Sequence, residues 1–249
     1  MGFSNVTLRS DTSLDLIQQM GDDLMIAKAA WVSTRDGLPE LKPGETIEDK
    51  VAGVLGFLMK NRHGTPFEHG AITIRVEAPI FIWREWHRHR IGFSYNEESG
   101  RYKKLEPVFY VPGAERAGHC IKPVDFKPSK PGWRGFLPIG ETDINTDNKG
   151  LKLSYQLAYE EYERRLSNQY DNGLARICLP VSIFSACYVT CNPRSLMAFL
   201  ELRTDSEQAT RRSHPLWELH QLAVKFEDLF ATCWPITHRL WNENGRVAP

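Results

Sequence analysis

The run RHRIGFSYNEESGRY, residues 88–102, combines several arginines with hydroxyl, amide and carboxylate side chains. Gly92 and Gly100 allow its backbone to bend close to a ligand. Arginine forks and hydroxyl groups at this density suit a phosphorylated small molecule that forms many hydrogen bonds. The alternative is a solvated charged loop. We favour a binding loop, because the charges alternate with aromatic residues and directly follow the apolar segment 78–86.

The composition is that of an ordinary globular protein, with 41% hydrophobic and 25% charged residues in a chain of 249. The 31 Lys and Arg residues balance 31 Asp and Glu residues. A general nucleic-acid-binding surface usually has excess positive charge, so we expect no nucleic-acid partner. The sequence has no basic-then-apolar leader, no apolar run of about 18 residues, and an odd number of cysteines. We therefore expect a cytoplasmic protein with reduced thiols and no membrane contact.

Hydrophobic periodicity and capping residues predict many helices and few strands. Helices are expected at residues 13–33, 46–62, 79–88, 151–170, 192–203 and 215–234. Strands are expected at residues 71–77 and 109–111, and residues 179–190 fit either a buried strand or a short helix. Prolines, glycines and aspartates predict a long irregular insertion at about 112–150. We predict a single α+β domain, residues 1–249.

A second polar cluster, HGTPFEH at residues 63–69, lies at a predicted helix-to-strand connection. Its His63, Glu68 and His69 could be metal ligands. However, their spacing does not place them on one helical turn, and Pro66 fixes a turn between them. Contacts to a cofactor are favoured over a metal site and over a purely structural turn.

A third group of candidates lies in the second half of the chain. Asn192 and Arg194 fall at the N-terminus of a predicted helix, where N–H groups and the helix dipole favour an anion. Arg176, Arg203 and His214 add further polar side chains, although each alone could be an ordinary surface residue. Neither a Gly-x-Gly-x-x-Gly motif nor a P-loop is present in the sequence.

Together these motifs resemble the flavin-dependent thymidylate synthases, the ThyX family. RHR followed by SYNEESGRY resembles the signature of that family. Further segments resemble the family in the same order, namely HGTPFEH, RICLP at 176–180, CNPRSLMAFLELRTDS at 191–206 and HPLWEL at 214–219. Several separated motifs in one order are more specific than a single motif.

The resemblance implies an α+β fold with a mainly antiparallel sheet flanked by several helices. It implies reductive methylation of dUMP to dTMP, with 5,10-methylenetetrahydrofolate as the carbon donor. The hydride would come from FADH2, regenerated by NADPH. The family also implies a homotetramer whose active sites are assembled at subunit interfaces, and no metal.

The resemblance also assigns individual residues. Those implied to bind dUMP are Glu85, Arg88, Glu97, Ser99, Gly100, Arg101, Arg176 and Arg203. Those implied to contact FAD are Ser33, His63, Thr65, Glu68, Arg88, His89, Arg90, Asn96, Glu97, Asn192, Arg194 and His214. Arg176 would grip the phosphate, and Arg203 would be catalytic by stabilising negative charge on the uracil ring. Ser99 is not expected to be a nucleophile, because the sequence fixes no neighbouring histidine as its base.

The chain departs from the family pattern at three places. The segment between RHR and Ser99 is one residue longer than in the family signature, and we expect a bulge at Gly92 to absorb the extra residue. Ala198 stands where relatives often have asparagine. The segments 112–150 and 207–213 are longer than the corresponding segments in compact members of the family.

Parts of the sequence also fit two other classes of function. A nucleotide- or RNA-binding module without catalysis would use Tyr95 and Tyr102 to stack on bases, but the balanced charge disfavours it. A metal-dependent hydrolase would use His63, Glu68, His69 and His87 as its polar residues. A strong chelator would abolish the activity of such an enzyme.

Overall fold

The computed structural model describes the backbone of residues 5–119 and 141–249 and the side chains of residues 5–116 and 144–249. The predicted insertion at 112–150 therefore lies partly outside the described residues, at 120–140. The chain forms two compact units. Unit 1 comprises Met1–Ser13, Val76–His87 and Asn96–Cys187, and unit 2 comprises Leu14–Arg75, Arg88–Tyr95 and Tyr188–Pro249.

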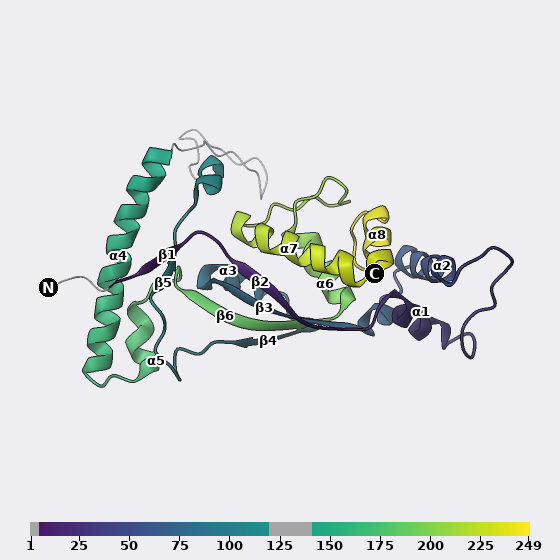
Figure 1. Ribbon diagram of the computed structural model, residues 1–249, viewed down its shortest axis with the longest axis horizontal. Coiled ribbons are helices and arrows are strands. Elements are labelled where there is room, and N and C mark those ends of the chain that lie inside the picture. Colours follow the sequence, from purple (N-terminus) through teal and green to yellow (C-terminus); the bar gives the residue numbers. More distant parts are fainter. Residues whose placement is uncertain (1–4, 120–140) are drawn as a thin grey trace. The chain divides into compact units, whose positions relative to one another are not determined.

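Unit 1 is organised around the long helix α4 (Glu141–Ser167), drawn in teal in Figure 1. Strands β1 (Thr7–Arg9) and β5 (Val108–Tyr110) form a parallel pair that shares a hydrophobic core with α4. In this core the ring of Phe109 stacks on that of Tyr155 at 4.8 Å. The smaller elements of unit 1 are the α-helices α3 (Ile80–Trp86) and α5 (Asn172–Ala175) and the 3-10 helices η2 (Ala114–His119) and η3 (Arg176–Cys178).

Buried tyrosines of α4 also bond the backbone that leads into β5. Tyr155 Oη donates to the Tyr110 carbonyl at 3.0 Å, and Tyr159 Oη donates to the Leu105 carbonyl at 2.9 Å. A buried tyrosine needs such a partner for its hydroxyl group. These bonds fix the segment that directly follows the signature run.

Unit 2 is mainly helical. Its helices are α1 (Asp23–Trp31), α2 (Ile47–Lys60), η1 (Thr65–Glu68), α6 (Pro193–Arg203), α7 (Trp217–Cys233) and α8 (Pro235–Glu243). Helices α6 and α7 pack together in Figure 1, and their core includes Phe199, Phe226 and Phe230, all fully buried. The buried Asp23 carboxylate accepts the N–H of Thr237 at 2.9 Å and so caps the start of α8.

A four-stranded sheet has the order β2-β3-β6-β4. Its strands are β2 (Ser13–Met20), β3 (Ala71–Pro79), β6 (Phe184–Cys191) and β4 (Phe93–Glu97). All four strands have residues in both units, so the division of the chain does not fall in linkers. The α+β class and the mainly antiparallel sheet confirm the predicted fold. Within the described residues, no helix has the length and hydropathy needed to cross a membrane.

Local signals were reliable where capping and periodicity agreed. The helices expected at 46–62, 192–203 and 215–234 correspond to α2, α6 and α7. Thr46 and Asp49 form a reciprocal capping box at the start of α2. The strands expected at 71–77 and 109–111 are β3 and β5, and residues 179–190 contain strand β6 rather than a helix.

Two local predictions were wrong, and two further features were not predicted. Residues 13–33 form strand β2 and helix α1, separated by Gly21 in the left-handed region at φ +78°. Residues 141–150, predicted to be irregular, begin α4, where Ile144 is buried. Arg62 takes the left-handed conformation after α2, at φ +59°. Helix α8 was missed, since Pro235 at its first turn follows α7 almost directly.

Candidate active site

The N-terminus of α6 provides an anion-binding position in unit 2. Asn192 caps the helix, and its Oδ1 accepts the N–H of Ser195 at 2.8 Å. Pro193 occupies the first helical position, where its missing N–H costs nothing. Arg194 lies on the same turn. The other N–H groups, the helix dipole and this guanidinium all favour a negatively charged ligand.

Arg194 links α6 to the HGTPFEH cluster. Its Nη1 donates to Glu68 Oε1 at 2.6 Å, and its Nε donates to the Pro249 carbonyl at 2.8 Å. Gly64 is packed between these groups, because an added Cβ would lie 2.6 Å from the Pro249 oxygen. Glycine therefore permits the close approach that brings Glu68 and Arg194 together, and both were predicted flavin contacts.

The signature run also reaches this end of α6. Gly92 has φ +68°, in the left-handed region that favours glycine. A Cβ on Gly92 would overlap Ser195 Oγ and lie 3.0 Å from the Asn192 amide nitrogen. The position predicted to absorb the extra residue is therefore a close backbone approach to the helix cap.

His89 and Arg203 form a direct contact. Arg203 Nε donates to His89 Nε2 at 2.9 Å. Burial, together with the Arg203 charge, lowers the pKa of His89 to about 4. At neutral pH the imidazole is thus uncharged and can accept this bond. The His89 ring also packs edge-on against the Phe199 ring, with 4.9 Å between the ring centres. Phe199 therefore fixes the position of the imidazole that accepts the bond from Arg203.

Two other predicted flavin contacts line a separate hollow of unit 2. Ser33, just after α1, and His63, just after α2, border a cavity of about 620 Å³. Its lining combines the cations Arg35 and Lys50 with the carboxylates Glu45 and Asp49, and Lys50 is paired with Glu45 at 2.9 Å. Phe57 contributes an aromatic face, and polar groups beside an apolar wall are typical of a small-molecule site.

The predicted nucleotide residues of unit 1 follow strand β4. Gly100 is buried, and an added Cβ would lie 3.2 Å from Arg176 Cδ. This close approach places Ser99, Gly100 and Arg101 beside Arg176 on η3. The Asn172 amide donates to the Arg101 carbonyl at 3.3 Å. Within the described ranges, neither the Arg101 nor the Arg176 guanidinium forms an ion pair, so both can meet a phosphate.

The predicted site residues thus separate into two sets. Those in unit 1 are Glu85, Asn96, Glu97, Ser99, Gly100, Arg101 and Arg176. Those in unit 2 are Ser33, His63, Thr65, Glu68, Arg88, His89, Arg90, Asn192, Arg194, Arg203 and His214. The boundary falls between Tyr95 and Asn96, within the signature run itself. Arg88, Arg90 and His214 are exposed, and Glu85 is half-buried on α3.

The structure bears on metal ligation and on one of the thiols. In the part of the chain that the structure describes, no group of three or more His, Cys, Asp or Glu residues is placed to hold a metal ion. The alternative metal site at His63, Glu68 and His69 is therefore wrong. Burial raises the pKa of Cys187, with a smaller effect from Glu97, to about 12, as expected of a core thiol.

Some residues of this region carried no visible signal in the sequence. Ser195 packs against Gly92, and only its place on the first turn after Asn-Pro marks it. The carbonyls of Val247 and Ala248 accept bonds of 3.1 Å and 3.2 Å from Arg62, next to the HGTPFEH cluster. Contacts between segments so far apart in sequence have no local pattern.

The chain matches the family model described as "Thymidylate synthase complementing protein" over residues 15–236. It is 42% identical over 245 residues to the flavin-dependent thymidylate synthase of Streptomyces avermitilis, covering 98% of this chain and 96% of that relative. It is 37% identical over 240 residues to that of Tropheryma whipplei, covering 96% of each.

A solved structure shares the fold. The UMP/dUMP methylase PolB from Streptomyces cacaoi, bound with 5-Br dUMP, matches with a TM-score of 0.86 and 39% identity. The match covers 98% of this chain and 100% of that chain. With the family model and relatives above 30% identity covering nearly the whole sequence, the chain belongs to the flavin-dependent thymidylate synthase family.

Proposed function

We propose that this enzyme converts dUMP to dTMP, with 5,10-methylenetetrahydrofolate as the carbon donor and FADH2, regenerated by NADPH, as the hydride source. The observation that carries the proposal is the anion-binding end of α6, where Gly64 and Gly92 bring two separate motifs against Asn192 and Arg194. This arrangement fits a dinucleotide phosphate in a chain that lacks the usual glycine-rich fingerprint.

The residues of unit 2 would hold the flavin, and the flavin would supply the hydride. Asn192 and Arg194 would bind its phosphates, with Glu68 orienting the Arg194 guanidinium. Thr65, Arg88, Arg90 and His214 of unit 2, and Asn96 and Glu97 of unit 1, are proposed as further contacts on the basis of the family resemblance. Ser33 and His63 would contribute the cavity beside α1 and α2.

The nucleotide would be held chiefly by unit 1. Arg176 and Arg101 would bind the phosphate of dUMP, and Glu97 and Ser99 would orient the base, with Glu85 beside it. Arg203, held by the neutral His89 imidazole, would stabilise negative charge that develops on the pyrimidine ring. We propose that residues 1–249 act as one catalytic domain in the cytoplasm.

A second substrate is supported by one comparison. The similar solved protein is described as a methylase of both UMP and dUMP, and the same protein bound with 5-Br UMP matches with a TM-score of 0.84. We therefore propose UMP as an alternative substrate. Parallel assays with UMP and dUMP at equal concentration would rank the two nucleotides.

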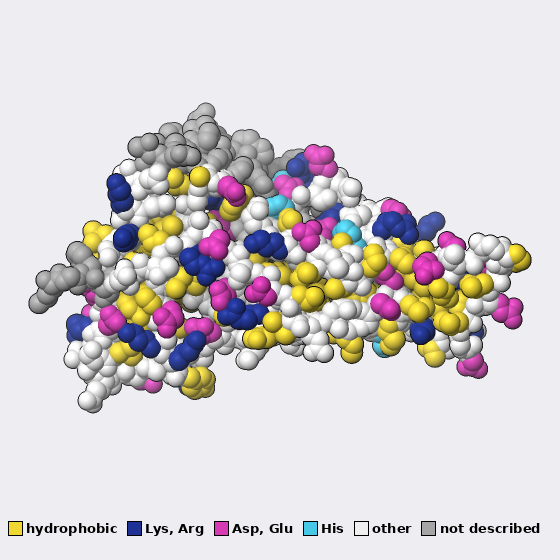
Figure 2. All heavy atoms as spheres, in the orientation of Figure 1, with side chains coloured by type: hydrophobic (Ala, Val, Ile, Leu, Met, Phe, Trp, Pro, Cys, Tyr) yellow, Lys and Arg dark blue, Asp and Glu magenta, His cyan; other side chains and the backbone are white. Residues whose placement is uncertain are grey.

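We also propose assembly into a homotetramer. Figure 2 shows hydrophobic side chains exposed over the region of α1 and α2. The exposed apolar residues there include Val32 at 77%, Phe57 at 57% and Met25 at 44%. Large apolar surfaces usually mark a contact with a partner. Light scattering after size-exclusion chromatography would test the proposal, and a monomer at micromolar concentration would contradict it.

The proposed reaction is tested most simply with the purified protein. We expect a yellow protein with flavin absorption that forms dTMP from dUMP only when methylenetetrahydrofolate and NADPH are both present. A colourless protein that takes up no added FAD would contradict the proposal. Activity that is abolished by a strong chelator would favour the metal-dependent alternative.

A further inference from the structure

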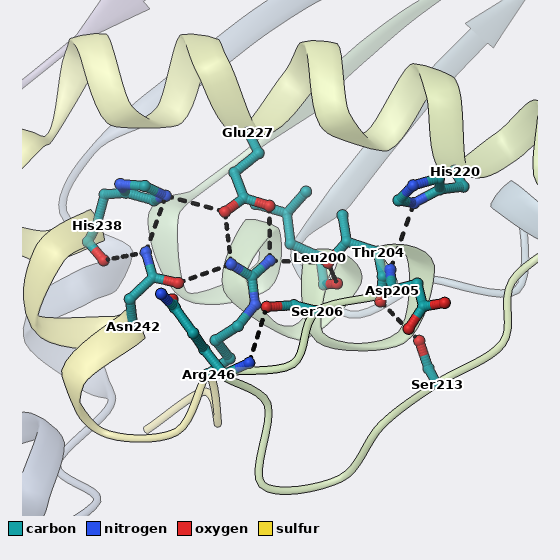
Figure 3. Close-up of polar contacts among 11 residues, drawn as sticks. Leu200, Thr204, Asp205, Ser206, Ser213, His220, Glu227, His238, Asn242 and Arg246 are labelled. Carbon is teal, nitrogen blue, oxygen red and sulfur yellow. Dashed lines mark hydrogen bonds and ion pairs between the residues drawn. The ribbon is translucent and has the colours of Figure 1, made fainter.

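A buried ion pair connects the turn after α8 to helix α7. Arg246 is only 4% exposed, and its Nη1 and Nη2 donate to Glu227 Oε1 and Oε2, both at 2.6 Å. The guanidinium also lies over the Trp241 ring, 4.1 Å from its centre. Figure 3 shows this two-pronged contact, with His238 reaching the same carboxylate.

The carboxylate keeps its charge although its side chain is only 17% exposed. Burial by itself raises the pKa of Glu227, but the hydrogen bonds from His238 and Arg246 outweigh it and leave a pKa of about 2. Arg246 has a left-handed backbone at φ +57°, unusual for a residue with a side chain. A conformation of this kind persists where the surrounding contacts compensate for its strain.

The second partner of Arg246 is the end of helix α6. Nη2 donates to Thr204 Oγ1 at 2.8 Å, and Thr204 Oγ1 donates in turn to the Leu200 carbonyl at 2.6 Å. Thr204 is the C-cap of α6 and directly follows Arg203. Its hydroxyl therefore joins the buried ion pair to the helix turn that carries Arg203.

The same region holds the loop between α6 and α7. Ser213 Oγ donates to the Thr204 carbonyl at 2.8 Å, and the Thr210 N–H donates to the Gly245 carbonyl at 2.9 Å. In Figure 3 Ser213 and Thr204 lie together on the side of the network away from His238. The turn at 245–246 thus contacts the start and the middle of a loop that leads to His214.

Stability alone does not account for this ion pair. Replacing a buried ion pair by apolar residues of similar volume is often neutral or stabilising, so such a pair is weak evidence for stability. The aromatic core around Phe230 already joins α7 and α8. An apolar side chain could add to that core, but it could not donate to Thr204. The donor is what requires arginine at position 246.

We propose that Arg246 is a positioning residue, which with Glu227 fixes Thr204 and through it orients the Arg203 guanidinium against His89. The proposal rests on the function proposed above, in which Arg203 acts on the pyrimidine. Arg246 itself contacts neither ligand in this account. It acts through one hydroxyl group.

Thr204→Val is the decisive variant, because it keeps the side-chain shape and the Arg246–Glu227 pair but removes the connecting hydroxyl. We expect kcat per FAD-loaded enzyme to fall roughly tenfold, as for the loss of one charged hydrogen bond, with KM for dUMP little changed. Arg246→Lys, which lacks the two-pronged guanidinium group, should show the same fall in kcat. Thr204→Ser should restore wild-type kcat. Arg239→Met, which removes an exposed pair with Glu243 on α8, is the matched control and should change nothing.

A second measurement does not depend on turnover. When Arg203 leaves His89, the imidazole loses a neighbouring positive charge, and an NMR titration should show His89 protonating at higher pH in Thr204→Val than in wild type. Wild-type kcat and an unchanged His89 titration in Thr204→Val, even with a lower Tm, would overturn the inference. A wild-type protein that converts no dUMP while His89 still shifts in the variant would instead refute the proposed function and leave the positioning role supported.

Discussion

Four arginines of the candidate site are held in different ways, two in unit 1 and two in unit 2. In unit 1, Arg101 is exposed and Arg176 is half-buried, and in the described residues neither is paired with a carboxylate. In unit 2, Arg194 is paired with Glu68, and Arg203 is bonded to His89. Arg101 and Arg176 are thus left available, whereas Arg194 and Arg203 are held by internal partners.

This difference indicates different tasks. An unpaired arginine pays little to exchange water for a phosphate, so the unit 1 set suits a substrate that binds and leaves. A guanidinium already fixed by a neutral acceptor needs no reorganisation when charge develops on the substrate. The unit 2 set therefore suits a resident cofactor and the stabilisation of a reacting ring.

The largest effect is expected at Arg203. Arg203→Ala removes the cation proposed to stabilise the ring, and we expect kcat to fall by about 10²–10³, as for the loss of an oxyanion-stabilising donor. FAD content should remain near that of wild type. The matched control is Arg212→Ala, an exposed arginine paired with Asp205. Steady-state assays on FAD-saturated protein measure both, and a small change at Arg203 would contradict its catalytic role.

Gly92 tests how tightly the signature run must approach α6. Gly92→Ala introduces both backbone strain and a clash with Ser195, and we expect FAD affinity to fall roughly tenfold. Gly44→Ala is the control, because Gly44 has φ +82° but nothing within 4 Å of an added Cβ. It should lose about 1 kcal/mol of stability with unchanged FAD affinity. Fluorescence titration with FAD measures the affinity of both variants. An equal loss of FAD affinity in the two would show that the clash with Ser195 is not the cause.

The pH dependence of stability should report His89. The folded protein holds the pKa of His89 near 4, against an ordinary value of 6.5, so the unfolded chain binds the extra proton between these values. The free energy of unfolding should therefore fall as pH drops from 6.5 to 4, by about 1 kcal/mol after allowance for solvent screening. His89→Gln should flatten this part of the profile, whereas the exposed His69→Gln should not. If denaturant unfolding gave the same pH profile for wild type and His89→Gln, the imidazole of His89 would not be buried and neutral as described.

The smallest effect is expected at Ser99. Its Oγ accepts the Arg101 N–H at 3.3 Å, which is a weak local contact rather than the geometry of a nucleophile. Ser99→Ala should keep measurable activity, with kcat within about tenfold of wild type. Complete loss of activity with intact dUMP binding would show that the serine takes part in the chemistry.

Sequence analysis predicted the local elements of the site better than its long-range contacts. The Thr46 capping box and the Asn192-Pro193 helix start are encoded within a few residues, and both were found. The residues 13–33 were misassigned, because Leu14, Ile17 and Met20 fit a helical face while Gly21 breaks the segment.

The contacts that organise the site join distant positions. Arg194 and Glu68 are 126 residues apart, and Arg203 and His89 are 114 residues apart. The bond from Arg246 to Thr204 spans 42 residues and carries no motif. The sequence could identify most of these side chains as polar candidates, but only the fold could show which partner each one meets.

Ligand binding to matched arginine variants tests the central contrast most directly. FAD affinity and, at saturating FAD, dUMP affinity would be measured for Arg194→Ala and Arg176→Ala by isothermal titration calorimetry. We expect Arg194→Ala to weaken FAD and Arg176→Ala to weaken dUMP, each by roughly 10- to 100-fold, with little effect on the other ligand. Equal weakening of both ligands by both variants would contradict the division between a flavin-binding unit 2 and a nucleotide-binding unit 1.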